Sequence, residues 1–450
     1  MTANAACLPD LLLNASGELD AGKLPGNDKS SILFAADFWV RPEHSIHQPD
    51  DLFSPEILKL VQQSTFAVVN FEGGVRPDGT KGIPKSGPHL AMHRCAPQIL
   101  KSCGFHACTL ANNHAMDYGV EALRDVLRLS DDCALQHAGA GLNMQQAMQP
   151  LTLSLPGETG VRILSMCERE FGVTDGSRPG TAWLTSPEAE DAVAQAKRES
   201  HVVIVCAHGG NELMPLPSAQ RRRQLQRLID AGADLVIGHH PHVPQGWEPY
   251  GNSYIFYSLG DFYFDSRDGR RYDYCDWGYM VVAHLRDRRI HRLEVLPYER
   301  ADNKVTRLGS RRDAAAHLAY LEQLSHILGS KDFDGYWQQL AIDRLPAYES
   351  VLRSRLASAR ITWRKRLKDT LNLGRAAVDL WLDTPAPGAD GLSPVLAQEA
   401  LGALNSIRCD SHRWVIETAL SVLSGESPDL RSPAIREQLK TMAPFYGYRT

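Results

Sequence analysis

Short apolar runs alternate with amphipathic segments over the first two thirds of the chain. The runs are rich in Val, Ile, Phe and Tyr and end at Gly, Asn or Asp, which is typical of buried strands. We therefore expect strands at residues 32–36, 66–71, 106–110, 161–166, 202–207, 235–238, 254–259, 280–284 and 290–296.

The segments between these runs carry helix signals. Ser186 and Pro187 are typical of an N-cap followed by a proline in the first turn of a helix, and Gly232 follows the helix predicted at 220–230. The pattern predicts helices at residues 55–63, 96–103, 120–129, from 187 onward and at 220–230. The alternation of strands and helices favours an α/β fold.

The pattern changes after about residue 300. Residues 311–383, 397–424 and 434–441 have helical periodicity, and a loop or linker rich in Pro and Gly spans about 384–394. We expect an N-terminal extension over 1–30, an α/β domain over 31–300 and a helical C-terminal region over 301–450.

Composition narrows the class of protein. The 450 residues carry a net charge of -5, so no nucleic-acid partner is expected. The nine cysteines form no CxxC pair, and their odd number argues against a disulfide framework.

The N-terminus lacks a basic region before its leucines, and no apolar run approaches the roughly 20 residues that span a bilayer. We therefore expect a cytoplasmic protein.

Polar residues gather at the ends of five predicted strands. In α/β sheets the carboxyl ends of strands line the ligand crevice. Carboxylate and imidazole groups there suit Mn, Fe or Zn. The residues are Asp37, Asn70, Glu72, Asn112, Asn113, His114, His208, Glu212, His239, His240 and His242.

Several of these residues have a simpler explanation when taken alone, whereas the His239-His240-Pro241-His242 stretch by itself favours metal ligation. Asp37 would be a turn former, Asn112 and Asn113 would form a turn, and His208 would be a hydrogen-bonded core histidine. Five strand ends with such residues are improbable as separate accidents. The ordered set therefore favours one metal site.

The order of these stretches resembles the CapA family of bacterial capsule and poly-gamma-glutamate synthesis proteins, within the calcineurin-like metallophosphoesterases. The resemblance covers roughly residues 31–300. It implies a metallophosphatase-like α/β/β/α layered sandwich before the helical C-terminal region. The stretches that carry it are FAAD (34–37), VNFE (69–72), LANNHAMDYG (110–119), HGGNE (208–212), GHHPHVPQ (238–245) and YSLGDF (257–262).

The resemblance implies a set of ligands and a mechanism. One or two divalent ions (Mn, Fe or Zn) would be held by Asp37, Glu72, Asn113, His208, His240 and His242. His239 would be a ligand or would orient one, and Glu212 would be a ligand, support one or be a solvated acid. A water activated by the metal would attack the substrate. Asp37 and His114 are the expected catalytic residues, with His114 protonating the leaving group.

The chain departs from the family pattern at four positions. Ala36 replaces the usual Gly, Asp261 replaces an Asn, and Glu72 stands for the bridging Asp of the phosphoesterases. Trp39 occupies the place of a histidine ligand. A single tightly held metal therefore remains an alternative to a pair.

Substrate contacts are less sharply indicated. Lys85, where the family has a lysine, could bind a phosphate or carboxylate, or it could be a solvated loop residue. His89 in the same loop and Arg178 are further candidates. Asp117 could orient an imidazole or cap the helix at 120–129, and we favour the cap. The expected substrate is a small molecule or polymer precursor, anionic in character.

A basic stretch at residues 353–368 has helical spacing of its apolar residues. It could contact an anionic membrane surface or a partner complex, but packing on its own domain is the more common role of such a stripe.

Three functions are compatible with these features. The first is a phosphoesterase-type metal-dependent hydrolase in capsule, poly-gamma-glutamate or other envelope-polymer synthesis. The second is metal-dependent amide or carboxylate (gamma-glutamyl) chemistry. The third is a non-catalytic accessory subunit of a polymer-synthesis complex. Retention of Asn113, His114 and the histidines favours a working site.

Overall fold

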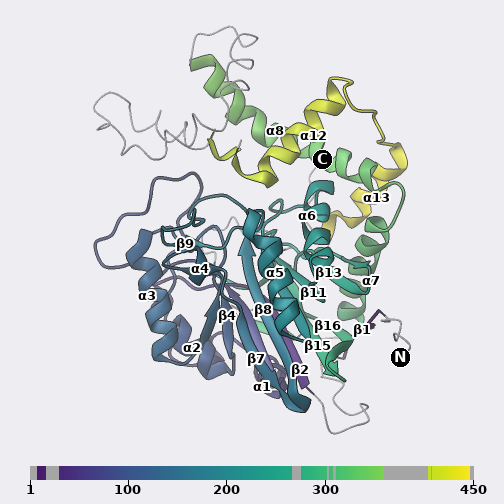
Figure 1. Cartoon of the computed structure of the whole chain (residues 1–450). Coiled ribbons are helices and arrows are strands. Elements are labelled where there is room, and N and C mark those ends of the chain that lie inside the picture. Colours follow the sequence, from purple (N-terminus) through teal and green to yellow (C-terminus); the bar gives the residue numbers. More distant parts are fainter. Residues whose placement is uncertain are drawn as a thin grey trace.

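Two β-sheets face each other and helices cover their outer surfaces in the computed structural model (Figure 1). The structure describes residues 8–16, 30–265, 275–301, 304–307, 311–358, 404–406 and 408–445. Strands of the two sheets contact each other, as β11 does with β2 and β5 does with β7 and β8. The predicted α/β class and the layered order are confirmed.

The first sheet has nine strands in the order β1-β16-β15-β2-β3-β4-β5, with β14 on β2 and β17 on β16. Strand β2 pairs in parallel with β3 and antiparallel with β15. The strands are β1 (Asp10–Leu13), β2 (Ser30–Trp39), β3 (Phe66–Phe71), β4 (Ala107–Thr109), β5 (Gln136–Ala138), β14 (Asp261–Phe264), β15 (Trp277–Arg286), β16 (Arg289–Ala301) and β17 (Lys304–Arg307).

The second sheet has six strands in the order β12-β13-β11-β10-β8-β7. The four central strands run parallel, and β7 and β12 are antiparallel edge strands. The strands are β7 (Leu151–Leu155), β8 (Thr159–Cys167), β10 (Val202–His208), β11 (Leu235–His239), β12 (Trp247–Tyr250) and β13 (Ser253–Phe256). A two-stranded sheet joins β6 (Ala140–Gly141) to β9 (Gly180–Thr181).

Helices connect the parallel strands where helical spacing predicts them. Helices α1 (Pro55–Gln63), α2 (Ala96–Cys103) and α3 (Gly119–Asp132) belong to the first sheet, and α5 (Pro187–Glu199) and α6 (Ala219–Asp230) to the second. Helix α1 illustrates how the local sequence sets the start of a helix and its buried face. The side chain of its N-cap Ser54 accepts a hydrogen bond from the Ile57 backbone, and Ile57, Leu60 and Val61 form its buried face. Shorter helical segments in the described residues are α4 (Met144–Ala147) and 3-10 helices at Pro49–Asp51, Pro156–Glu158 and Ala443–Phe445.

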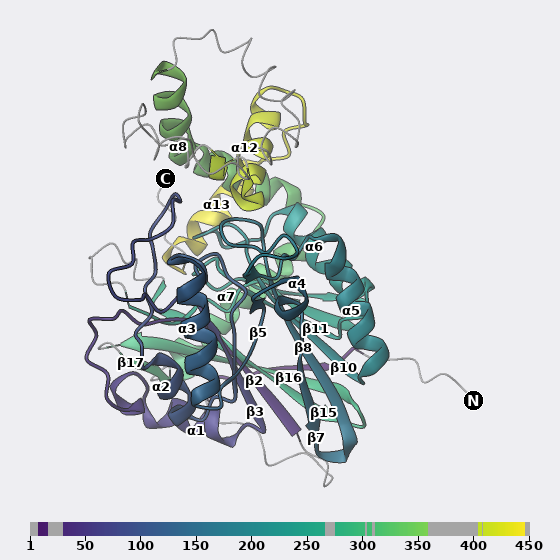
Figure 2. The same ribbon diagram turned by 60° about the vertical axis from the view of Figure 1, so that its left-hand side comes forward.

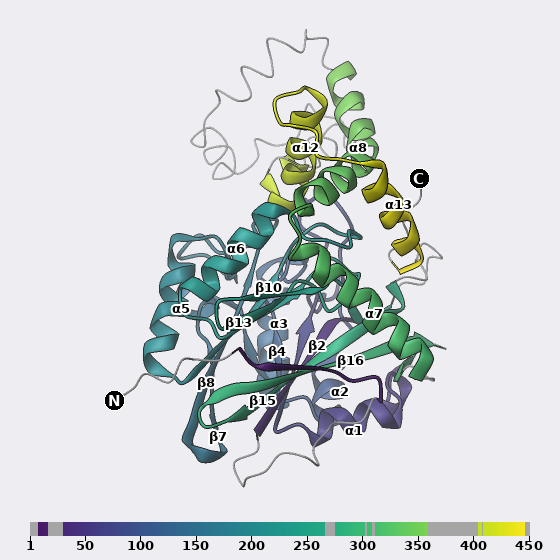
Figure 3. The ribbon, with the colours of Figure 1, turned by 90° about the vertical axis from the view of Figure 1, so that its right-hand side faces the viewer.

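The helical C-terminal region packs directly on the α/β body. Helix α7 (Arg311–Leu328) contacts β12 and β16, and Trp277 of β15 lies against His317 and Tyr320. Helix α8 (Phe333–Ser358) contacts α12 (Asp410–Leu423) and α13 (Pro433–Met442). Figures 2 and 3 show α8 and α12 beyond one end of the two sheets.

Some boundaries differ from those expected from the sequence. Residues Asp10–Leu13 of the expected N-terminal extension pair with β16, so they are part of the sheet. The expected linker at 384–394 lies outside the described residues, as does the basic stretch beyond residue 358. Residues 353–358 belong to α8. No described helix is long and apolar enough to cross a membrane.

Candidate metal centre

Asp37 lies where the two sheets meet, and two hydrogen bonds hold its carboxylate. Oδ1 accepts a hydrogen bond from Asn70 Nδ2 at 2.9 Å, and Oδ2 accepts one from the backbone N–H of His240 at 2.9 Å. His239 Nδ1 lies 3.1 Å from Oδ1. Asp37 is fully buried. Contacts from β3 and β11 thus tie the first sheet to the second at this carboxylate.

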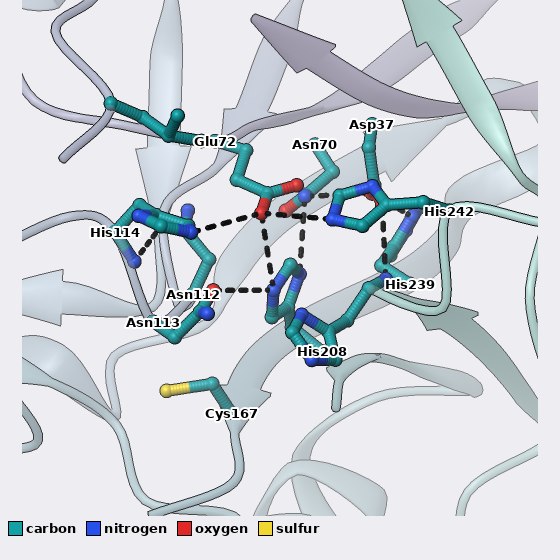
Figure 4. Close-up of polar contacts among 12 residues, drawn as sticks. Asp37, Asn70, Glu72, Asn112, Asn113, His114, Cys167, His208, His239 and His242 are labelled. Carbon is teal, nitrogen blue, oxygen red and sulfur yellow. Dashed lines mark hydrogen bonds and ion pairs between the residues drawn. The ribbon is translucent and has the colours of Figure 1, made fainter. Parts of the chain in front are cut away.

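Glu72 is a buried acid with three imidazoles at ion-pair distance from one of its carboxylate oxygens (Figure 4). Its Oε1 lies 3.9 Å from His114 Nε2, 3.8 Å from His208 Nε2 and 3.7 Å from His242 Nε2. These distances exceed those of hydrogen bonds. Among the described residues, neither carboxylate oxygen of Glu72 has a hydrogen-bond partner.

This arrangement fits a divalent cation. A buried carboxylate without a partner is costly, whereas a cation among its neighbours would satisfy it. The ligand atoms of Glu72, His208 and His240 lie within 4.8 Å of one another, as do those of Asp37, His242 and Asp261 and those of Glu212, His240 and His242. The donors are oxygen and imidazole nitrogen, a set that suits Mn, Fe or Zn.

The loop after β11 is held in a strained conformation. His240 has φ 98° and His242 has φ 56°, in the left-handed region that residues other than glycine rarely adopt. Such strain persists where the surroundings over-determine it, and it is concentrated at functional sites. At Gly238 a Cβ would approach the Tyr257 carbonyl oxygen to 2.1 Å, so a residue without a side chain is needed as the strand enters the loop.

The electrostatics of the histidines differ across the site. Burial lowers the pKa of His208 well below its ordinary value and that of His240 to about 4. Burial also acts to lower the pKa of His242, but the carboxylates of Asp261 and Glu72 outweigh it and raise that pKa well above normal. Burial raises the pKa of Glu72 well above its ordinary value. The lowered pKa favours the neutral imidazole at His208 and His240, which is the form that binds metals.

Asp261 is a candidate ligand that the sequence presented only as a departure from a family pattern. It begins β14, whose pairing with β2 places it beside Asp37. Its Oδ1 lies 2.8 Å from His242 Nδ1. The sequence feature that could have indicated this role is the acidic residue Asp261 in the SLGDF stretch (258–262).

Trp39, for which the resemblance implied a missing histidine ligand, has a structural contact. Its indole Nε1 donates to the Ala91 carbonyl at 2.9 Å, and its ring lies against Phe264. Asp261 supplies a further donor close to Asp37 instead.

His114 is oriented by Asp117 rather than being a free loop residue. His114 Nδ1 lies 2.7 Å from Asp117 Oδ2, and the same oxygen accepts a hydrogen bond from the Leu90 backbone at 2.7 Å. The expectation that Asp117 caps α3 is wrong, because Tyr118 is the N-cap residue and makes no side-chain cap bond. The carboxylate is instead used to hold the imidazole, whose Nε2 faces Glu72.

The remaining candidates from the sequence have definite positions. Asn113 Oδ1 lies 3.1 Å from His208 Nε2, and metal ligation by Asn113 stays a prediction. His239 Nδ1 lies 3.1 Å from Asp37 Oδ1, and His239 belongs to none of the candidate groups among the described residues. Glu212 Oε1 lies 4.0 Å from His240 Nε2.

The three predicted substrate-binding residues do not converge. Lys85 is buried, with its ammonium bonded to Asp117 and 3.1 Å from His114 Nδ1. His89 lines a cavity of about 990 Å³ that also exposes His242 and Asp261. Arg178 is ion-paired with Asp175 and lines a different cavity of about 690 Å³. Substrate binding by these residues stays a prediction.

A family model and several curated proteins are similar to this chain. A family model described as bacterial capsule synthesis protein PGA_cap matches residues 31–266. The PGA biosynthesis protein CapA of Bacillus subtilis is 32% identical over 249 residues, covering 53% of this chain and 63% of that protein. The capsule biosynthesis protein CapA of Bacillus anthracis is 30% identical over 252 residues, covering 53% of this chain and 58% of that protein. The chain thus spans less than two thirds of the length of these curated relatives.

A probable polyglutamine synthesis accessory protein of Mycobacterium tuberculosis is 30% identical over 206 residues, covering 43% of this chain and 54% of that protein. Among solved structures, a hypothetical protein from Thermus thermophilus matches with 14% identity and a TM-score of 0.37, covering 60% of this chain and 99% of that one. A 5'-nucleotidase from Candida albicans matches with 12% identity and a TM-score of 0.35, covering 61% of this chain and 52% of that one.

Proposed function

Because the chain belongs to the PGA_cap family of bacterial capsule synthesis proteins, we propose that it acts in the synthesis of an envelope polymer as a metal-dependent hydrolase of phosphoester substrates. The names of the relatives from the two Bacillus species support the place in polymer synthesis. The chemistry rests on the site itself, since a fold or family hosts several reactions.

One observation carries the proposal. Glu72 is completely buried, and none of the described residues hydrogen-bonds either of its carboxylate oxygens. Three imidazole nitrogens point at one of those oxygens from 3.7, 3.8 and 3.9 Å. A purely structural core would not leave a carboxylate in this state.

A divalent ion held by Glu72, His208 and His240 would act as a Lewis acid and make water nucleophilic near neutral pH. A second group, formed by Asp37, His242 and Asp261, would hold another ion. The hydrogen bonds from Asn70 and the His240 backbone keep Asp37 in place for this role.

His114 would donate a proton to the leaving group. Asp117 fixes one ring nitrogen, so the other, Nε2, is presented to the centre. Positioned general acids of this type typically contribute about 10²–10⁴-fold to a rate. The reaction requires a substrate oxygen to come within reach of this nitrogen.

The cavity beside the centre suits an anionic substrate. It measures about 990 Å³, and His242 and Asp261 form part of its wall. Arg41, Arg76 and Arg94 also line it and would attract phosphate or carboxylate groups.

Amide chemistry at a gamma-glutamyl bond is the second candidate, because the same activated water could attack a carbonyl. A non-catalytic role is the third, and the name of the mycobacterial relative, an accessory protein, is consistent with it.

An activity screen separates the three. The full-length protein, loaded in turn with Mn²⁺, Fe²⁺ and Zn²⁺, would be assayed with p-nitrophenyl phosphate, bis-p-nitrophenyl phosphate and gamma-glutamyl-p-nitroanilide. We expect phosphoester hydrolysis that Glu72→Gln abolishes and Glu437→Gln, an exposed control, leaves unchanged. Hydrolysis of the anilide alone would favour amide chemistry. No turnover by metal-loaded protein would favour the accessory role.

A further inference from the structure

The buried carboxylate of Glu168 lies between helix α12 and His240 of the candidate metal centre. Glu168 follows β8 and is 2% exposed. Its Oε1 lies 3.8 Å from His240 Nε2. Its Oε2 accepts a hydrogen bond from the Ser411 hydroxyl of α12 at 2.6 Å. A chain of two contacts thus connects α12 to a candidate ligand.

The two nitrogens of His240 have different surroundings. Nδ1 is buried and has no hydrogen-bond partner among the described residues, whereas Nε2 faces Glu168. A histidine that binds a metal through one nitrogen generally donates the N–H of the other to a carboxylate or carbonyl, and that partner fixes the ring. Nδ1 is the nitrogen left for the ion, and Glu168 is the acid placed for the other.

Glu212 is the competing acid, at 4.0 Å from the same His240 nitrogen. The side chain of Glu212 is 46% exposed, whereas that of Glu168 is 2% exposed. Water screens an exposed carboxylate and leaves it mobile, so Glu168 is the stronger orienting group.

Contacts around Glu168 hold it in this position. The Cys409 thiol, at the N-cap of α12, lies 3.6 Å from its Oε1. Ser411 also accepts a hydrogen bond from the Gly210 backbone at 3.1 Å, and its carbonyl accepts one from Asn211. A Cβ on Gly209 would approach the Glu168 side chain to 2.9 Å. The glycine directly after His208 therefore leaves the space that Glu168 occupies.

We propose that Glu168 is a positioning residue that orients His240 for metal binding, and that Ser411 holds Glu168 in place. The C-terminal helical region, which lies beyond the residues matched by the family model, thereby contributes to the affinity of the centre. This inference rests on the proposed metal site.

The test measures metal affinity in the full-length protein. Mn²⁺ and Zn²⁺ dissociation constants would be determined by competition with a chromogenic chelator for wild type, Glu168→Gln, Ser411→Ala and the double variant. Ser424→Ala, at the exposed end of the same helix, is the matched control. Urea unfolding of the metal-free forms reports structural effects separately.

We expect Glu168→Gln to weaken affinity about 10–100-fold, the range seen for such supporting carboxylates. Ser411→Ala should weaken it less, and Ser424→Ala should not change it. Because Ser411 acts through Glu168, its effect should vanish in the Glu168→Gln background. A change in unfolding alone would indicate a merely structural role.

Two outcomes overturn different claims. If wild type binds metal and loses it on His240→Ala, while Glu168→Gln and Ser411→Ala bind as wild type does, only the positioning role is wrong. If wild type binds neither ion, both the proposed metal site and this inference are wrong. Should Glu168→Gln not fold, unchanged affinity in Ser411→Ala is sufficient to refute the link to α12.

Discussion

The Nδ1 atom of His242 lies 2.8 Å from Oδ1 of Asp261, the residue paired with Asp37 across β14 and β2. His242 is also 3.8 Å from Asp37 Oδ2. An imidazole between two buried carboxylates makes this group a candidate for the second ion.

Asp261→Asn is predicted to lower affinity at this group while leaving the group around Glu72 intact. The amide removes a negative charge, and a neutral oxygen is a weaker ligand for a divalent cation. We expect the number of tightly bound ions to fall from two to one, measured by elemental analysis after exhaustive dialysis. Asp131→Asn removes an exposed acid that pairs with His137 and should change nothing. An unchanged metal content in Asp261→Asn would exclude Asp261 as a ligand.

His114→Ala is predicted to slow hydrolysis about 10²-fold or more without loss of metal, because it removes the group that transfers the proton. The measurement is kcat with a substrate whose leaving group is poor, alongside metal content. The effect should shrink with p-nitrophenolate, a leaving group that needs little protonation. His137→Ala is the control, at a partly buried histidine paired with Asp131. Equal losses with good and poor leaving groups would contradict a general-acid role.

Asp117→Asn is predicted to destabilise the fold by about 3 kcal/mol, since it leaves the buried ammonium of Lys85 without its counter-ion. Lys85 and Asp117 are both nearly inaccessible to solvent and are bonded to each other. Urea unfolding gives the free energy of unfolding, and Asp125→Asn is the comparison, at a partly exposed acid of α3 that pairs with Arg128. If Lys85→Met restores stability in the Asp117→Asn background, the unpaired charge is the cause. Wild-type stability of Asp117→Asn would show that the pair is not needed.

Glu72→Gln is predicted to have opposite effects with and without metal. In metal-free protein the change removes a carboxylate that is buried without a partner, so stability should be no lower than that of wild type. With metal present at 100 times its dissociation constant, wild type should gain about 2.7 kcal/mol and Glu72→Gln should gain little. Thermal unfolding in EDTA and in Mn²⁺ measures both. A variant that gains as much as wild type would show that Glu72 is not a ligand.

Much of the centre could be predicted because its residues directly follow apolar strands. Once 32–36, 66–71, 202–207 and 235–238 are recognised as strands of an α/β fold, Asp37, Glu72, His208 and His240 are expected at carboxyl ends of strands. Asp37 and Glu72 belong to one sheet and His208 and His240 to the other, so the packing of β2 against β11 brings the two pairs together. The helix start predicted at Ser186 and Pro187 is likewise local and is confirmed, although the Ser186 side chain makes no capping hydrogen bond.

The contacts that sequence did not reveal are between distant segments. Asp117 was expected to cap a helix, because nothing local shows that Lys85 and Leu90 return to it. Glu168 follows a strand like the ligands do, but its role depends on Ser411, 243 positions later. Similarly, Asp10–Leu13 carries no alternation that predicts its pairing with β16. Such pairings depend on tertiary packing rather than on local pattern.

The most direct test is the metal content of purified wild type and His240→Ala, measured by inductively coupled plasma mass spectrometry after reconstitution with Mn²⁺, Fe²⁺ or Zn²⁺. His201→Ala, at a surface histidine, is the control. A centre built on Glu72, His208 and His240 predicts near-stoichiometric metal in wild type and the control and its loss in His240→Ala. Absence of bound metal from wild type with every ion, or equal content in His240→Ala, would contradict it.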